Sequence, residues 1–190
     1  MTKDRKQIIL QALAKLLEER AATKITTAVL ARESGITEAA LYRHFPSKRV
    51  IFLELFQFCD LTIFQKVGEI KKDLSKESSE KIKLIFFFFI IFLEKNKGFS
   101  RILSREALGP NEKNVIDAVN QFFERLELSI KQILALDKES INFTPGISSH
   151  LLISAMEGII SRFIRNGFKE MPSSYLENYW VMLSQSIFKN

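Results

Sequence analysis

Apolar residues recur along most of this chain every three or four positions, the spacing that collects them on one face of an α-helix. The clearest example lies between about 112 and 136, where one long stripe is formed by Val115, Val119, Phe122, Leu126, Ile130 and Ile133. No segment sustains the apolar–polar alternation that is typical of a strand. The pattern therefore predicts an all-α protein.

Breaks in this pattern divide the chain into nine expected helices. Two of the breaks are polar stretches, at 71–80 and 137–146. The expected helices span about 3–19, 28–34, 37–44, 47–72, a Phe-rich segment that ends before 96, 100–108, 112–136, 147–166 and 173–188.

Three local signals are expected to fix helix ends. Gly98 is expected to end the Phe-rich helix as a left-handed C-cap. Gly109-Pro110 is expected to stop the short helix that follows. Ser174 and Glu177 have the spacing of a capping box, which predicts the start of the last helix.

The most hydrophobic part of the chain is the run LIFFFFIIFL, residues 84–93. Ten residues span only about 15 Å as a helix, half the hydrocarbon thickness of a bilayer, so we expect a buried helix and no membrane contact. Apolar residues make up 46% of the chain, and 17 of its residues are Phe, which is ample material for a core. The N-terminal segment is amphipathic and lacks the apolar region of a signal peptide. A single cysteine, Cys59, excludes an internal disulfide and suits a reducing cytoplasm.

The segment KITTAVLARESGITEAALYRHFPSKR, residues 24–49, has the pattern of two short helices joined by a glycine turn. Thr26 and Thr27 supply N-cap hydroxyls for the first helix, and Thr37 caps the second. Gly35 takes the turn, where a positive φ costs glycine least. This pattern predicts a helix-turn-helix, which places its second helix in the major groove of DNA.

A helical wheel predicts which side of the second helix faces outward. Leu41 and Phe45 share the face that packs on the first helix, whereas Ala39 and Arg43 point away from it. The outward face is therefore small and cationic. It suits close approach to base edges, with a guanidinium available for guanine.

Phosphate contacts are expected at the borders of this face. Tyr42 and His44 lie on its flanks, and Lys48 adds a cation in the first turn of the next helix, beside N–H groups that favour anions. Residues 1–50 carry 10 Lys/Arg and 5 Asp/Glu, whereas the rest carry 18 and 17. This concentration of positive charge favours DNA binding over an ordinary helical hairpin with a solvated polar face.

These residues resemble the DNA-binding domain of the TetR family of bacterial regulators, whose signature is close to ITEAALYRHFPSK here. The resemblance implies a nine-helix TetR-like fold, with a DNA-binding domain at 1–50 and a helical dimerisation and partner- or ligand-binding domain at 51–190. It also implies that Tyr42, His44 and Lys48 meet phosphates. The full set of expected DNA-binding residues is Thr26, Thr27, Thr37, Ala39, Tyr42, Arg43, His44 and Lys48.

The resemblance extends into the second part of the chain. The segments NKGFSRIL, FFERLE and EGIISRFIRNGFKEMPS are similar to those of SlmA-type nucleoid occlusion factors. Those TetR-fold proteins bind chromosomal sites and block assembly of the division protein FtsZ over the nucleoid, which implies a cytoplasmic, nucleoid-associated protein. The C-terminal tail of FtsZ would dock between the fourth and fifth helices, where a cationic rim beside an apolar groove is formed by Phe58, Lys66, Phe88, Lys95 and Asn96. The Phe run is bulkier than the aliphatic run of that subfamily.

The last two helices are expected to form a homodimer through a four-helix bundle. The final helix carries the apolar stripe Leu176, Tyr179, Trp180, Leu183 and Ile187, and its neighbour carries small residues that permit close approach. A palindromic DNA site requires two DNA-binding domains one helical turn apart. The alternative is that both helices close the core of their own chain. The expected dimer-interface residues are Ser154, Gly158, Trp180 and Leu183.

A second function class is a ligand-responsive repressor with a small apolar ligand inside the helical bundle. Its pocket would be lined by large rings: Phe89, Phe92, Phe122 and Phe123. An enzyme is not expected, because Cys59 and His150 have no catalytic partner at a suggestive spacing. The chain has no glycine-rich phosphate loop and no Cys/His metal spacing, so we expect no cofactor and no metal.

Overall fold

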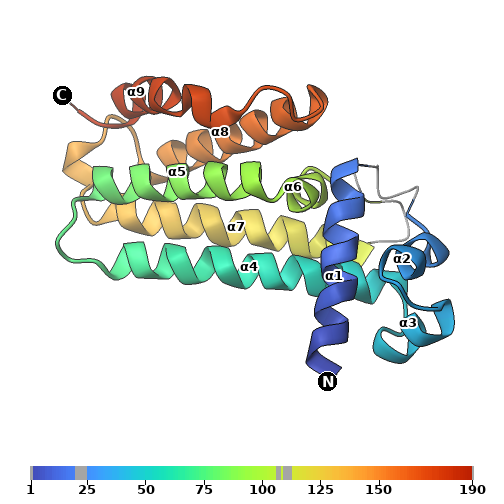
Figure 1. The fold of residues 1–190 in the computed structure, drawn as a ribbon. Helices are drawn as coiled ribbons and strands as arrows, with labels where there is room; N and C mark the ends of the chain where they lie inside the picture. The colour runs from blue at the N-terminus through green and yellow to red at the C-terminus, as the bar shows by residue number, and fades with distance from the viewer. Residues whose placement is uncertain (1, 20–24, 106–107, 109–112, 190) are drawn as a thin grey trace. The chain divides into compact units, whose positions relative to one another are not determined.

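Nine α-helices make up most of the described chain, which is residues 2–19, 25–105, 108 and 113–189 of a computed structural model (Figure 1). No strand occurs in these residues; one isolated antiparallel bridge joins Ile141 to Phe188. The prediction of an all-α fold is confirmed. The helices are α1 (Thr2–Glu19), α2 (Thr27–Glu33), α3 (Glu38–His44), α4 (Lys48–Lys72), α5 (Ser78–Lys95), α6 (Lys97–Leu103), α7 (Lys113–Ala135), α8 (Pro145–Arg165) and α9 (Leu176–Ile187), with 3-10 turns η2 (Lys138–Ser140) and η3 (Pro172–Tyr175).

Packing divides the chain into two compact units. Unit 1 comprises Met1–Leu61 and Asn96–Asn120, and unit 2 comprises Thr62–Lys95 and Gln121–Asn190. Helices α4 and α7 each contribute residues to both units. The predicted domain boundary at residue 50 divides the chain into two continuous segments, whereas each packing unit combines two separate segments. The predicted boundary therefore stays a prediction. The predicted stop at Gly109-Pro110 lies outside the described residues.

In unit 1, helix α1 supplies the apolar face that the sequence predicts. Ile9, Leu13, Leu16 and Leu17 are all buried. Helix α1 packs on α2, α3 and α6, so these side chains form the centre of the unit. Residues from distant parts of the sequence thereby support the two short helices.

Gly98 does not end a helix in a left-handed conformation, and that prediction is wrong. Of the glycines in the described residues, only Gly35 and Gly167 have a positive φ. Gly98 lies inside α6, where a Cβ would stand 2.6 Å from the backbone oxygen of Ala14 and 3.0 Å from the Cβ of Leu17. The glycine is required here because α1 and α6 approach too closely for a side chain.

In unit 2, the two predicted apolar helices each bury an apolar side. The α7 residues Phe122, Leu126, Ile130 and Ile133 are at most 1% exposed, and Val115 and Val119, which belong to unit 1, are fully buried as well. The Phe-rich segment forms most of α5, with Phe86, Phe89, Ile90 and Leu93 buried. The prediction for α7 is confirmed, whereas α5 is buried on one side only: Leu84 is exposed, and Phe87, Phe88, Ile91 and Phe92 are half-buried. Helix α8 meets the length and hydropathy of a membrane span, as core helices of many proteins do, and 44% of that window is buried.

The last helix begins differently from its prediction. Residues Pro172–Tyr175 form the turn η3, and α9 begins at Leu176 without a side-chain cap. Ser173 is held by Glu94 of α5, which accepts hydrogen bonds from its backbone N–H at 2.8 Å and its hydroxyl at 3.0 Å. Glu177 forms an ion pair with Lys83 at 3.0 Å. The predicted capping box therefore does not form. Ser173, next to the predicted cap Ser174, and Glu177 bind residues of α5 instead.

Candidate nucleic-acid interface

The first short helix is fixed at both ends by side-chain hydroxyls. Thr26 Oγ1 accepts a hydrogen bond from the N–H of Val29 at 3.2 Å, and the Ser34 hydroxyl donates to the carbonyl of Leu30 at 2.7 Å. Leu30 and Ala31 are buried. Thr27, which the sequence suggested as a second cap, is the first residue of the helix and does not cap it.

The turn between the helices depends on Gly35. Its φ is +65°, a conformation that is strained for residues with a Cβ. The Gly35 N–H donates to the carbonyl of Arg32 at 3.1 Å, and the Ile36 N–H donates to that of Ala31 at 3.0 Å. The turn therefore satisfies the carbonyls at the end of α2 while it redirects the chain into α3.

Helix α3 is oriented by a buried apolar pair. Thr37 caps it, accepting from the N–H of Ala40 at 3.1 Å. Leu41 and Phe45 are fully buried, and α3 packs on α2 and α1. Lys6 of α1 lies over the Phe45 ring, 4.8 Å from its centroid, and forms an ion pair with Glu54 at 3.0 Å. The wheel prediction for the inward face is confirmed.

The opposite face of α3 carries the residues that the sequence placed there. Ala39 and Arg43 are exposed, Tyr42 is half exposed, and His44 is half-buried. Thr26 and Thr37 are exposed as well. Their oxygens accept the capping hydrogen bonds, so each hydroxyl proton remains available to donate to an anion.

The start of α4 adds a cation to this surface. Ser47 Oγ accepts from the N–H of Val50 at 3.4 Å. The Lys48 side chain is half-buried, with its Nζ 5.2 Å from the centroid of the Phe52 ring. Arg49 is exposed in the same turn. Sequence reasoning did not select Arg49, although its position next to Lys48 in a first helical turn was a usable signal.

The residues predicted to bind a partner are distributed over both units. In unit 1, Phe58 is 64% exposed and Asn96 is half-buried. In unit 2, Lys66 and Lys95 are exposed and Phe88 is half-buried. Each unit thus presents some of these side chains at its surface.

Helices α4 and α5 enclose a surface hollow of about 220 Å³ within unit 2. Lys66 lies on its edge and forms an ion pair with Glu69 at 3.1 Å. Lys76 lies 3.4 Å from Asp73. The rim here carries both signs of charge, whereas the sequence suggested a cationic one. The lining residues are Lys66, Glu69, Ile70, Asp73, Lys76 and Leu84.

The outer side of α8 and α9 holds three of the four residues predicted for a dimer. Ser154 and Gly158 are exposed, and Leu183 is half-buried. No atom lies within 4 Å of a Cβ placed on Gly158. A hollow of about 320 Å³ lies between the two helices, lined by Ala155, Gly158, Ile159, Arg162, Tyr179, Met182 and Leu183.

Trp180 lies in the core of its own chain. It is 8% exposed, and its ring centroid is 6.3 Å from those of Phe86 and Phe188. Leu176 and Ile187, from the same predicted stripe, are also buried. The exposed apolar residues of α9 are instead Val181 and Met182. The alternative of own-core packing therefore holds for this side of α9.

The rings suggested as the lining of a ligand pocket pack against one another. Phe89 and Phe122 are stacked with centroids 6.0 Å apart. Phe64 and Phe123 meet Phe122 edge-on, at 5.4 Å and 5.3 Å. These rings fill space within unit 2. Phe92 is half-buried and packs on Phe88 at 5.8 Å.

The remaining reactive side chains do not form a catalytic arrangement. Burial raises the pKa of the Cys59 thiol to about 12, so it stays protonated and inert at neutral pH. His150 is largely exposed, with its Nδ1 3.7 Å from Glu127. Within the described residues, no three His, Cys, Asp or Glu side chains are grouped to hold a metal ion.

The fold and the helix-turn-helix surface define a helical DNA-binding regulator. Residues 9–55 match the bacterial regulatory proteins of the tetR family, and residues 76–187 match the tetracyclin repressor-like C-terminal domain of the SlmA type. The nucleoid occlusion factor SlmA of Vibrio cholerae is 39% identical over 189 residues, which cover 97% of this chain and 96% of that protein. The chain belongs to the TetR family of bacterial regulatory proteins, whose members are DNA-binding regulators, not enzymes.

Solved structures share this fold at much lower identity. NalD of Pseudomonas aeruginosa, the secondary repressor of the MexAB-OprM multidrug efflux pump, has a TM-score of 0.83 at 18% identity, covering 99% of each chain. The SmeT–triclosan complex has a TM-score of 0.82 at 15% identity, covering 98% of this chain and 93% of that one. The fold is therefore compatible with very different sequences.

Proposed function

We propose that this protein is a nucleoid occlusion factor, which binds dispersed chromosomal sites as a homodimer and blocks FtsZ assembly over the nucleoid. The observation that carries this proposal is the extent of the identity with the SlmA relative, which covers nearly the whole chain. Proteins of the same fold are only 18% identical. Because the fold alone does not require this similarity, its extension through residues 76–187 supports a shared function of that part.

DNA binding rests on the exposed face of α3 and the start of α4. Tyr42, His44 and Lys48 bind phosphates, as do the hydroxyls of Thr26 and Thr37. Arg43 extends from the last turn of α3 and reads a base edge, most simply the O6 and N7 atoms of guanine. Ala39 permits the close approach that this contact requires. Thr27 is a weaker candidate, because it is half-buried.

Lys48→Ala should weaken binding to specific and unrelated DNA by similar factors, because phosphate contacts carry no direct sequence information. A dimer loses two cations, so the slope of log affinity against log salt should flatten by roughly 2. Arg43→Ala should instead relax base preference and cost about 1–3 kcal/mol per half-site. Salt titrations with operator and scrambled DNA measure both effects. The control is Lys169→Ala, because Lys169 is an exposed lysine of unit 2, in the segment that follows α8. An unchanged salt slope in Lys48→Ala would exclude its phosphate contact.

The dimer forms through the outer side of α8 and α9. Ser154 and Gly158 leave room for a second copy, and the hollow beside Leu183 and Met182 accepts its side chains. A C2 interface of this kind presents the same surface twice and sets the spacing of two DNA-binding domains on a palindrome.

Gly158→Leu should weaken the dimer and leave the folded chain intact, because the position is open within one chain. Overpacking a close helix contact costs about 1–3 kcal/mol. Light scattering across a dilution series measures the shift toward monomer. Gly68→Leu is the matched control, because Gly68 is also open but lies on α4. A wild-type protein that is monomeric at micromolar concentration refutes this interface.

The tail of FtsZ docks on the surfaces of α4 and α5. In unit 2, Phe88 supplies an apolar contact and Lys66 and Lys95 supply positive charge; in unit 1, Phe58 and Asn96 are the residues that the SlmA resemblance assigns to the same role. The Glu69 partner of Lys66 competes with an acidic tail for that cation. The mutual packing of the Phe rings favours this interaction over the alternative of an interior ligand pocket.

Tail binding should respond in opposite directions to two neighbouring substitutions. Lys66→Glu should reduce affinity for the FtsZ tail peptide, whereas Glu69→Gln should increase it, because Lys66 loses its competitor. Lys95→Glu should also weaken binding, and Lys169→Glu serves as control. A peptide titration with and without operator DNA measures each effect at two salt concentrations. Absence of binding at ~1 mM peptide, a threshold of about −4 kcal/mol, in both states would refute the proposed function.

A further inference from the structure

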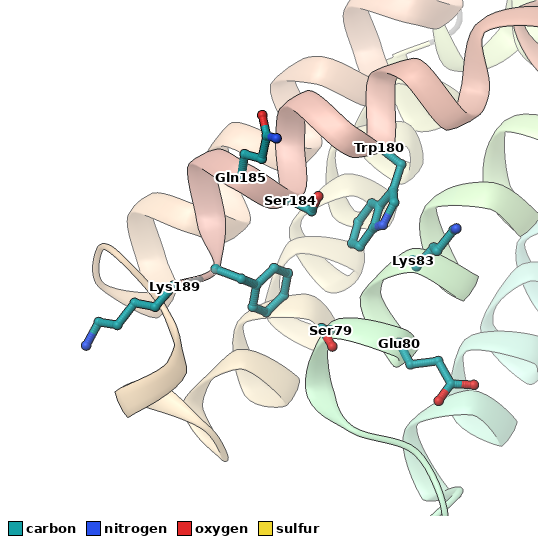
Figure 2. A pocket seen from close by; sticks show the side chains of 8 residues that line it. Ser79, Glu80, Lys83, Trp180, Ser184, Gln185 and Lys189 are labelled. Atoms are coloured by element: carbon teal, nitrogen blue, oxygen red, sulfur yellow. The ribbon is translucent and has the colours of Figure 1, made fainter.

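A third hollow, a cleft of about 320 Å³, lies within unit 2, between the start of α5 and the end of α9 (Figure 2). It is separate from the DNA-binding surface, from the α4–α5 hollow and from the α8–α9 hollow, and shares none of their residues. Its volume is at the lower end of the range for small-molecule sites. The lining residues are Ser79, Glu80, Lys83, Trp180, Ser184, Gln185, Phe188 and Lys189.

The aromatic wall of this cleft is held in place by the loop between α7 and α8. The two N–H groups on Asn142 Nδ2 are shared among the carbonyls of Gln185, Ser186 and Phe188, at 3.3, 3.2 and 3.0 Å. The backbone N–H of Asn142 also donates to the carbonyl of Ile187 at 2.8 Å. These bonds satisfy the carbonyls at the C-terminus of α9 and fix Phe188 against Trp180, 6.3 Å between ring centroids.

Trp180 supplies a polar group that has no partner among the described residues of this cleft. Its side chain is 8% exposed, and no described residue accepts a hydrogen bond from its Nε1. Figure 2 shows the indole extending from α9 into the space beside Lys83. Because buried indole N–H groups usually find an acceptor, this donor points to a ligand that carries one.

The charges around the cleft favour an anionic acceptor. Lys83 and Lys189 are the two cations of the lining, and Glu80 is its one acid. Glu80 lies 3.4 Å from Lys76, outside the lining, which offsets its negative charge. Lys83 forms an ion pair with Glu177 at 3.0 Å and keeps further N–H donors. The backbone N–H groups at the start of α5 add to the attraction for an anion.

We propose that this cleft binds a small aryl carboxylate. The carboxylate accepts hydrogen bonds from Trp180 Nε1 and Lys83 Nζ, and the aromatic ring packs against the cleft-facing sides of Phe188 and Trp180. The cleft lies apart from the Phe-lined bundle interior in which a ligand pocket was expected from the sequence. The proposal rests on none of the roles in DNA binding or FtsZ binding, so its failure would leave the proposed function standing.

The test is a titration of the full-length protein with 3-phenylpropionate, followed by intrinsic fluorescence. Trp180 is the only tryptophan of the chain, so emission excited beyond the absorption of the three tyrosines reports on the surroundings of this side chain. We expect a saturable change at low millimolar concentration, which suits a ligand of this size. The neutral 3-phenylpropionamide has the same shape and should bind about tenfold more weakly, because a charge-assisted hydrogen bond is lost.

Two variants separate the role of Lys83 from the packing of α5 on α9. Lys83→Gln should remove the tenfold preference for the carboxylate. Glu177→Gln breaks the same ion pair but keeps the cation, so it should preserve or increase carboxylate affinity. Lys169→Gln, outside the cleft, should have no effect. Equal binding of acid and amide, a loss of binding in Glu177→Gln, or no saturable change with either compound would overturn the proposal.

Discussion

The orientation of α3 depends on the burial of two side chains that are one helical turn apart. A helix of seven residues is unstable by itself, because nucleation costs more than so few hydrogen bonds return. Helix α3 therefore persists through its packing, and Leu41 and Phe45 are both fully buried. That burial fixes the rotation of the helix about its axis. It directs Ala39 and Arg43 outward, where a DNA groove can receive them.

The rest of unit 1 supports this arrangement. The caps at Thr26 and Thr37 and the left-handed Gly35 set the ends of the two short helices. Helix α1 covers their apolar side, and it is itself held by α6 through the contact at Gly98. Each of these features is local, but together they leave α3 one orientation. The outward surface of α3 is consequently preorganised, which limits the entropy lost in the base contacts proposed for it.

The long helices could be predicted from the sequence, and the ends of several could not. Periodicity determines which face of α7 is buried, because six apolar residues share it. The predictions of a C-cap at Gly98 and of a capping box at Ser174 were wrong for the same reason. A local signal predicts a cap, but a partner from a distant segment, Ala14 or α5, decides the conformation.

The candidate site residues could likewise be predicted only where local sequence decides which side of a helix is buried. The outward face of α3 follows from the wheel, because only one side of a short helix can be buried. The burial of Trp180 could not be predicted from the sequence. Helix α9 carries large apolar residues on more than one side, Trp180 on one and Val181 and Met182 on another, and the sequence does not say which side packs on α5. Pairing of Lys66 with Glu69 was equally hidden, although the two are three residues apart on one helix. Lysine composition alone therefore overstated the positive charge of the rim.

The fold is shared with a repressor that is only 18% identical in sequence, so the fold does not determine the function. We propose that this member of the family acts on the nucleoid as a whole. The most direct test is a chromosome-wide map of the sites that the protein occupies in its own cells, with Arg43→Ala as the control for base recognition. If the protein is a nucleoid occlusion factor, it will occupy many dispersed sites, and the Arg43→Ala variant will lose them. Occupancy confined to one site beside its own gene would contradict the claim and identify a local repressor.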